Sequence, residues 1–465
     1  MTLHFPKPYP KIPITLVWAQ CIAFSMLYGV WMIYELLNFR RILLISGAVL
    51  ALYPIYQYRS YFFQKKALPI WLIVVLFIWS LLHLFFLAHD YPAQLLELRR
   101  IWKYAGLGAI FAFGLGLSLF SVSVNVANPR KKNFYWVIIY FGLCTPVLIY
   151  LFKYVATIYM PILGITPPDF LKISSNAYLA HYIPKTNYIA FCLPTLAVSL
   201  GQIYSVLSLK SRLRIKQYLS ICLYSLIVCA VLMIFYLQDT KNGIAYAIIC
   251  IAIFLVLLMR NMPSIKFWRK LLLLGVVIFA ASFLTYLHTQ KNESWKTLMA
   301  DTRIALQTDR YQQWRFPGEQ ELPRNEYGSI VSGTNYARAA WFKVGIQLAI
   351  ENPLGYGLVE DSFKNMVKAR WQEVGNYMSH SHSGWLDLIL AMGFPGFILI
   401  FSALIMLISQ TLGRVEPWGI LIFWGGIANV LLWITTEVSA TVTFAALIFW
   451  VCWGAGLTML PNKSH

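Results

Sequence analysis

The stretch "IWLIVVLFIWSLLHLFFLA", residues 70–88, decides the class of fold. A hydrocarbon core about 30 Å thick needs about 20 helical residues, and this run supplies them. In lipid the backbone must satisfy its own hydrogen bonds, so such a run forms a helix. The earlier run "ITLVWAQCIAFSMLYGVWMIYELL" (14–37) is too long for the apolar core of a cleavable signal peptide. It is therefore predicted to be the first transmembrane helix.

The composition agrees with these runs. Of 465 residues, 59% are hydrophobic and only 12% are charged, whereas about 25% of a soluble domain is charged. The sequence predicts an all-α polytopic membrane protein with about twelve transmembrane helices. Their predicted limits are 14–37, 42–58, 70–88, 107–124, 134–160, 186–208, 220–238, 243–259, 271–287, 384–408, 420–436 and 442–460.

The charges of the loops alternate along the chain and predict its orientation. The positive-inside rule places the basic loops and both termini in the cytoplasm. Most of the net charge of +20 is explained this way, so no nucleic-acid partner is needed. The basic loops are "RSYFFQKK" (59–66), "NPRKK" (128–132), "LKSRLRIK" (209–216), "RNMPSIKFWRK" (260–270) and the loop of Arg414.

The loops on the opposite side are the long ones and divide the chain. We predict helices and short loops over 1–287, a large extracytoplasmic loop over 288–383 and three more spans over 384–465. A second long segment lies at about 161–185. Helix connections are usually about 2–8 residues long, so the loop 288–383 is predicted to be functional.

The large loop is predicted to contain two helices. "SGTNYARAAWFKVGIQLAIENPLGYG" (332–357) shows helical spacing and ends in a Pro-Gly breaker, with Ser332 or Thr334 as cap. "EDSFKNMVKARWQEVG" (360–375) reads as a second, amphipathic helix with Asp361 as a possible cap. Both carry aromatic and basic residues, which suits the membrane interface.

The cysteines indicate neither disulfides nor a metal site. All seven lie in apolar runs, where small buried side chains are the ordinary interpretation, and no Cys-x-x-Cys pair occurs. They are Cys21, Cys144, Cys192, Cys222, Cys229, Cys250 and Cys452.

Two histidines stand where the large loop meets the tenth span, in "HSHSGWLDLILAMGFPG" (380–396). The positive end of a helix favours a neutral imidazole, which makes His382 a candidate general base. A capping or interfacial role is the alternative. A zinc site using His380 lacks a third ligand. The pair His382 and Asp387 also matches the His-x4-Asp pattern of glycerolipid acyltransferases, which are not usually large polytopic bundles.

Basic residues gather on the same side of the membrane. Arginine and lysine side chains there suit a phosphate or diphosphate, although a solvated surface is the alternative for each. They are Arg303, Arg310, Arg315, Arg338 and Lys241.

Together these motifs resemble the bacterial O-antigen ligase family and its superfamily. The family pattern is Arg, a few residues, Trp and a Pro-x-x-Gly-x-Gly motif, then His followed by Asn, Ser or Gln, nine further residues, Gly, two residues and Gly. The corresponding positions are Arg338, Trp341, Pro353, Leu354, Gly355, Tyr356, Gly357, His382, Ser383, Gly393 and Gly396. The segment from Pro353 to Gly357 is one residue shorter than the pattern. The late position of the large loop also fits.

The resemblance implies a GT-C-like, inverting glycosyltransferase in the bacterial inner membrane that needs no metal, cofactor or nucleotide sugar. Its donor would be a polysaccharide on undecaprenyl diphosphate, and its acceptor a lipid A–core sugar hydroxyl at the periplasmic face. His382 would activate the acceptor, with His380 as a supporting neighbour. Arg338 would hold the diphosphate, and Lys241 replaces a second family arginine. Arg99 and Arg100 suit lipid phosphates, or snorkel at a helix end.

Three alternatives remain open. An O-antigen polymerase would use two undecaprenyl-linked chains. A protein O-oligosaccharyltransferase would use a Ser or Thr acceptor, and it often carries a C-terminal soluble domain, which the ending "PNKSH" disfavours. A transporter would show mid-span ionisable groups and internal repeats; Glu437 is the ambiguous residue.

Overall fold

The computed structural model describes residues 9–126, 128–174, 181–208, 214–261, 295–375, 378–436 and 440–459, with scattered positions between 262 and 294. The described residues form helices joined by turns and loops, with no β-strand among them beyond an isolated bridge between Arg324 and Ile330. Within these residues, nine helices are long and apolar enough to cross a membrane, and two shorter apolar helices cover Ile14–Val30 and Val442–Thr458. The prediction of an all-α polytopic membrane protein is confirmed at this level.

Eleven main helices form the bundle in the part of the chain that the structure describes. They are α1 (Ile14–Val30), α2 (Leu37–Gln57), α3 (Leu68–Phe86), α5 (Lys103–Asn125), α6 (Pro129–Ile162), α7 (Lys185–Leu207), α8 (Ile215–Leu237), α9 (Lys241–Asn261), α14 (Gly384–Thr411), α15 (Pro417–Thr435) and α16 (Ala445–Thr458). The short α4 (Tyr91–Glu97) continues through a π-turn at Leu98–Trp102 into α5.

Several predicted limits were wrong. The first span was expected to reach residue 37, but α1 ends at Val30, and Glu35 lies in a separate 3-10 helix, where its carboxylate accepts the backbone N–H of His181. The fourth span was expected at 107–124, but its helix runs from Tyr91 to Asn125. The ninth predicted span, 271–287, lies mostly outside the described residues, as does Glu437. A total of twelve spans therefore stays a prediction.

Glycines allow the helices at the centre of the bundle to approach closely. A Cβ at Gly116 of α5 would lie 2.5 Å from the carbonyl oxygen of Trp453 in α16. A Cβ at Gly456 of α16 would lie 2.3 Å from the carbonyl oxygen of Phe113. Small residues bring backbones together in this way when lipid supplies no hydrophobic drive between helices. The backbones of α5 and α16 are thus in direct contact at the centre of the bundle.

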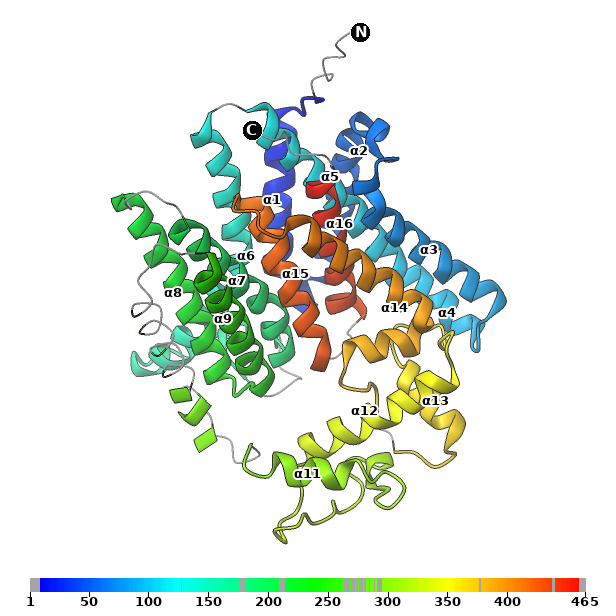
Figure 1. Cartoon of the computed structure of the whole chain (residues 1–465). Coiled ribbons are helices and arrows are strands. Elements are labelled where there is room, and N and C mark those ends of the chain that lie inside the picture. Colours follow the sequence, from blue (N-terminus) through cyan, green and yellow to red (C-terminus); the bar gives the residue numbers. More distant parts are fainter. Residues whose placement is uncertain are drawn as a thin grey trace.

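The large loop forms a helical layer at one end of the bundle (Figure 1). It contains α11 (Leu298–Ala305), α12 (Gly333–Glu351) and α13 (Ser362–Arg370). The beginning of α1 and the end of α16 lie at the opposite end, as do the basic α2–α3 and α5–α6 connections (Figure 1). The layer has its own apolar core, which includes Trp314, Trp341 and Phe363 and reaches Leu386 of α14.

Both predicted loop helices are present, and their caps differ from the expectation. Ser332 is the N-cap residue of α12 and Asp361 that of α13, but neither side chain accepts a hydrogen bond from its helix. Asp361 instead adopts a left-handed backbone with φ +59°. The second helix ends at Arg370, short of the predicted residue 375, where Trp371 turns to an extended conformation.

Candidate functional site

His382 lies at the junction between the loop layer and α14. Its backbone is left-handed, with φ +61°, a conformation that is uncommon for residues other than Gly, although His, Asn and Asp adopt it more often than the rest. Asp387, one turn into α14, accepts a hydrogen bond from the backbone N–H of Ser381 at 2.7 Å. The Ser381 hydroxyl donates to the carbonyl oxygen of Ser383 at 3.2 Å. Strained residues of this kind cluster at functional sites, held by their surroundings.

Trp341 of α12 fixes the imidazole plane of His382. The two rings stack with centroids 5.1 Å apart and an interplanar angle of 6°. Trp341 is buried and donates its indole N–H to the carbonyl oxygen of Trp314 at 2.9 Å. His380 meets His382 edge to face, with centroids 4.6 Å apart. The half-buried His382 ring is therefore oriented from two sides.

Two cations, Arg338 and Lys241, lie near each other, close to the beginnings of α12 and α9. Arg338 precedes Trp341 by one turn of α12, so both lie on the same helix face. Its guanidinium donates to the side-chain oxygen of Asn242 at 3.1 Å. The Lys241 ammonium donates to the side-chain oxygen of Asn335 at 3.0 Å. The charges of Lys241 and Arg338 are close enough to repel each other, so an anion between them would be favoured.

Asp301 of α11 holds the residue that binds Lys241. The Asp301 side chain is buried and accepts hydrogen bonds from the side chains of Thr297, Asn325 and Asn335 and the backbone N–H of Ser332, at 2.7–3.1 Å. Burial raises the pKa of this carboxyl, but the four hydrogen bonds outweigh burial and lower the pKa below its usual range. Asp301 therefore stays charged and keeps the Asn335 amide aimed at Lys241.

A second network joins Arg338 to α15. Asn242, which binds the guanidinium, donates to the carbonyl oxygen of Thr435 at 3.2 Å. The Tyr246 hydroxyl contacts the Thr435 hydroxyl and accepts the Thr435 backbone N–H at 3.0 Å. The cationic end of α12 is thereby tied to α9 and α15, which come from distant parts of the chain.

The glycines of the motif allow two backbone segments, the Pro353–Gly357 loop and α14, to touch next to the site. Gly393 interrupts α14 with φ +69°. The carbonyl oxygens of Leu390 and Ala391 accept the N–H groups of Tyr356 and Gly357 at 2.8 and 2.7 Å. A Cβ at Gly393 would lie 2.4 Å from the Leu354 carbonyl carbon, so the two backbones touch. The loop Pro353–Gly357 thus completes the hydrogen bonds of a broken helix, which lipid cannot do.

The same junction is supported from α3 and α4. The Trp79 indole N–H donates to the carbonyl oxygen of Met392 at 2.8 Å. The buried His83 ring lies between Gln94 and the carbonyl oxygen of Gly355, 3.4 Å from each. The Glu97 carboxylate accepts the backbone N–H groups of Val359 and Glu360 at 2.7 and 2.9 Å. Sequence reasoning gave no role to His83, Gln94 or Glu97.

Three of the remaining predicted arginines have other described partners, and the other two are exposed. Arg303 is exposed and pairs with Glu326 at 3.2 Å. Arg310 lies over the ring of Tyr311. The Arg315 guanidinium lies over the rings of Trp314 and Trp371. Burial lowers the pKa of Arg315. Arg99 and Arg100 are exposed in the π-turn after α4. Successive neighbours link His380 and His382 through Trp341 to Arg338 on the same face of α12, and Arg338 to Lys241; these residues are called the cluster around His382. Arg303, Arg310 and Arg315 make separate contacts.

Sequence reasoning missed the amide and hydroxyl partners of the cluster. Asn242 follows Lys241 directly, and Asn335 lies one turn before Arg338, so their neighbourhood to predicted cations was visible. Asp301 and Thr435 carry no comparable signal. Among the described residues, no group of three or more His, Cys, Asp or Glu side chains is placed to hold a metal ion.

Two comparisons bear on the identity of this site. The family model described as O-antigen ligase matches residues 226–401. This range contains α9, the whole loop layer and the first part of α14, and so includes every member of the cluster around His382. No protein of curated function matches the sequence.

Proposed function

Because residues 226–401 carry an O-antigen ligase domain, and the chain is identified by it as a member of the O-antigen ligase and polymerase superfamily, we propose that the protein is the ligase itself. It transfers O-antigen polysaccharide from undecaprenyl diphosphate to a sugar hydroxyl of lipid A–core at the periplasmic face. The observation that carries the proposal is the stack of Trp341 on the His382 imidazole, together with a pair of nearby cations, Lys241 and Arg338, the second of which lies one turn from Trp341 on α12.

The acceptor step belongs to His382. The helix end beside it favours the neutral imidazole, which accepts the proton of the acceptor hydroxyl. The hydroxyl oxygen forms a bond to the anomeric carbon while the bond from that carbon to the diphosphate oxygen breaks. The proton ends on the imidazole, and undecaprenyl diphosphate leaves with one more negative charge. Displacement from the opposite side inverts the configuration of the anomeric carbon.

The leaving group belongs to Arg338 and Lys241. Fixed cations stabilise the charge that develops on the diphosphate without reorganising during the reaction. Asn242 and Asn335 keep both cations in place. The planar guanidinium can bind two phosphate oxygens at once, whereas the lysine acts as a point charge. No metal is needed to neutralise the diphosphate in this scheme.

Membrane geometry supplies the rest of the rate. Both substrates are lipids confined to one leaflet, so their head groups meet at high effective concentration. His382 lies where the loop layer meets the beginning of α14, which is the level that such head groups reach. Arg99 and Arg100, exposed on the neighbouring π-turn, would then contact acceptor phosphates. His380 would support the His382 ring, because the two imidazoles meet edge to face.

The test is transfer by the purified chain with undecaprenyl diphosphate–polysaccharide and lipid A–core, without added metal or nucleotide. His382→Asn is the sharpest variant, because asparagine tolerates the left-handed backbone that His382 adopts. We expect it to lose transfer by about 100-fold or more while its thermal unfolding changes little. Arg338→Gln should lose a comparable factor, and Arg338→Lys should retain part of it.

Arg303→Gln is the matched control, because Arg303 is an exposed arginine of the same layer that is already paired with Glu326. Lengthening of the undecaprenyl-linked chain would make the protein a polymerase, and glycosylation of a Ser or Thr peptide an oligosaccharyltransferase. Movement of the lipid-linked glycan across vesicles with no transfer product would overturn the enzyme proposal.

A further inference from the structure

A cavity of about 520 Å³ lies at the end of the bundle opposite the loop layer. It is bounded by the end of α5, the beginning of α6, the α14–α15 connection and the end of α16. Its size falls within the range of about 300–1,000 Å³ typical of ligand pockets. Apolar and indole side chains form one part of the wall, and cationic and hydroxyl groups the other. The lining includes Lys132, Trp136, Arg414, Glu416, Trp418 and Thr458.

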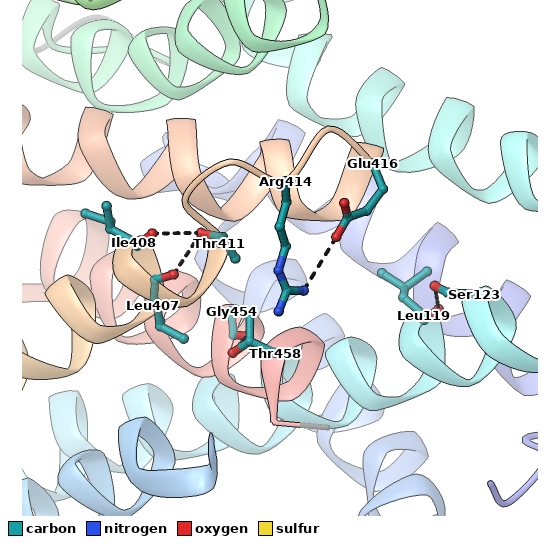
Figure 2. Close-up of polar contacts among 9 residues, drawn as sticks. All are labelled: Leu119, Ser123, Leu407, Ile408, Thr411, Arg414, Glu416, Gly454 and Thr458. Carbon is teal, nitrogen blue, oxygen red and sulfur yellow. Dashed lines mark hydrogen bonds and ion pairs between the residues drawn. The ribbon is translucent and has the colours of Figure 1, made fainter. Parts of the chain in front are cut away.

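Arg414 extends from the α14–α15 connection toward the end of α16 (Figure 2). Its side chain is only 18% exposed. In the part of the chain that the structure describes, its guanidinium has one polar contact, with the Glu416 carboxylate at 3.5 Å. A guanidinium has five N–H donors, and burying them without acceptors is costly. Among the described residues nothing accepts the remaining donors, so they can bind a ligand in the cavity.

Gly419 makes room for this arginine. A Cβ at Gly419 would lie 2.5 Å from the Arg414 Cβ and 2.9 Å from a Glu416 carboxylate oxygen. The first turn of α15 therefore packs directly against the arginine stem. The Lys66 ammonium is close enough to Arg414 for their charges to repel, which adds to the positive potential at this end of the bundle. An anion in the cavity would relieve that repulsion.

Helix capping explains one of the two cavity cations but not the other. The C-terminal ends of α5, α14 and α16 meet here, and such ends attract cations. Lys132 does cap a helix, because its ammonium donates to the Ser123 carbonyl oxygen at the end of α5. Arg414 lies beside the same helix ends, yet its described contact is a carboxylate. Its guanidinium is thus positioned for something other than a helix end.

We propose that this cavity binds a phosphate ester through the guanidinium of Arg414. The guanidinium matches two phosphate oxygens, and Thr458 supplies a hydroxyl nearby. Trp136 and Trp418, with ring centroids 5.5 Å apart, offer an apolar wall to the organic part of the ligand. The phosphate is carried either by a membrane lipid headgroup or by a soluble anion, and the mixed wall favours the lipid. Tryptophans at helix ends commonly lie at the level of headgroups.

The test uses the purified full chain in phosphatidylcholine nanodiscs and reads its thermal unfolding midpoint. One arm adds increasing fractions of dioleoyl phosphatidylglycerol, and the other adds inorganic phosphate. We expect the unfolding midpoint to rise with the lipid fraction until it saturates. In Arg414→Gln, half of that rise should require about tenfold more lipid. Glu416→Gln should bind more tightly, because it removes the carboxylate that competes for the guanidinium. Arg59→Gln, an exposed arginine of the same end outside the cavity, should match the native chain.

If Arg414→Gln fails to fold, Arg414→Lys serves instead, since it keeps the charge and loses the two-pronged geometry; a smaller weakening is then expected. A rise with inorganic phosphate alone, sensitive to Arg414, supports the phosphate site and assigns it to a soluble ligand. The proposal is overturned if neither probe raises the midpoint, or if the rise is the same in Arg414→Gln and Arg59→Gln.

Discussion

The ring of His382 shows how a single residue is positioned here. Its left-handed backbone turns the chain between the loop layer and α14, and Trp341 covers one face of the imidazole. The Asp387 carboxylate accepts the backbone N–H of Ser381, next to His382. Each constraint comes from a different segment, so the geometry of the ring depends on the fold of the whole layer.

Trp341 should matter for its ring plane as well as for its bulk. We expect Trp341→Phe to retain most transfer, because a smaller aromatic ring still stacks on the imidazole. Trp341→Leu should lose up to about tenfold more, since stacked aromatic pairs contribute about 0.5–1.5 kcal/mol. The measurement is kcat and KM for each variant. If Trp341→Phe and Trp341→Leu lose the same amount of transfer and have equal unfolding midpoints, the stack does not orient the base.

Asp301 should make the stability of the loop layer depend on acid. Its folded-state pKa is below the unfolded value of about 3.9, so its stabilising contribution is complete above that value. The contribution is lost as the pH falls through the lower, folded-state pKa. The native chain should therefore lose thermal stability between about pH 5 and 3 more steeply than Asp301→Asn. Parallel pH profiles of the two unfolding midpoints would contradict this account.

At the scale of elements, the decisive contact is the one between the Pro353–Gly357 loop and the break in α14. The loop supplies N–H groups to carbonyls that the break at Gly393 releases. Both Gly355 and Gly393 have positive φ, and each backbone occupies the space where the side chain of the other would stand. The glycine pattern in the sequence thus records a backbone-to-backbone contact.

Gly393→Ala should be far more destabilising than an alanine at an ordinary left-handed glycine. Gly318 is the matched control, with φ +79° and no atom within 4 Å of its Cβ position. Gly318→Ala should cost only the left-handed penalty of about 1–2 kcal/mol. Gly393→Ala adds a Cβ 2.4 Å from the Leu354 carbonyl carbon and should lower both yield and unfolding midpoint further. The unfolding midpoints in detergent provide the comparison, and similar shifts for both variants would refute the contact.

The sequence predicted elements better than their connections. Hydrophobic length located α3 and α7 closely, because lipid imposes one requirement on every span. It missed the early end of α1, beyond which Glu35 contacts His181, a residue distant in the chain. The motif identified His382, Arg338 and Lys241, but not Asp301, because its role is defined by four partners brought together only in the fold.

At the scale of the whole molecule, two ends of one bundle carry different chemistry. The loop layer holds His382 and its cations at one end, and the basic connections lie at the other (Figure 1). The cavity of Arg414 is at this second end, beside the α5–α6 connection. A lipid bound there would act on the helices that also support the site, α14 and α15 among them.

This arrangement predicts which surfaces face which side of the membrane. Ser329 is exposed in the loop layer, and Ser60 is exposed in the basic α2–α3 connection. In intact spheroplasts, a membrane-impermeant maleimide should label Ser329→Cys, whereas Ser60→Cys should react only after the membrane is opened. The native chain is the control for its seven cysteines. The reverse pattern would invert the orientation and exclude a periplasmic site.

The break at Gly393 also bears on how the protein is made. Every group that satisfies its exposed backbone comes earlier in the chain, in Trp79 of α3 and in the Pro353–Gly357 loop. When α14 emerges from the ribosome and enters the lipid, its partners have already been synthesised. The interrupted helix need not wait in the bilayer for a later segment to complete it. The order of translation thus spares the cell an insertion intermediate with bare carbonyls in hydrocarbon.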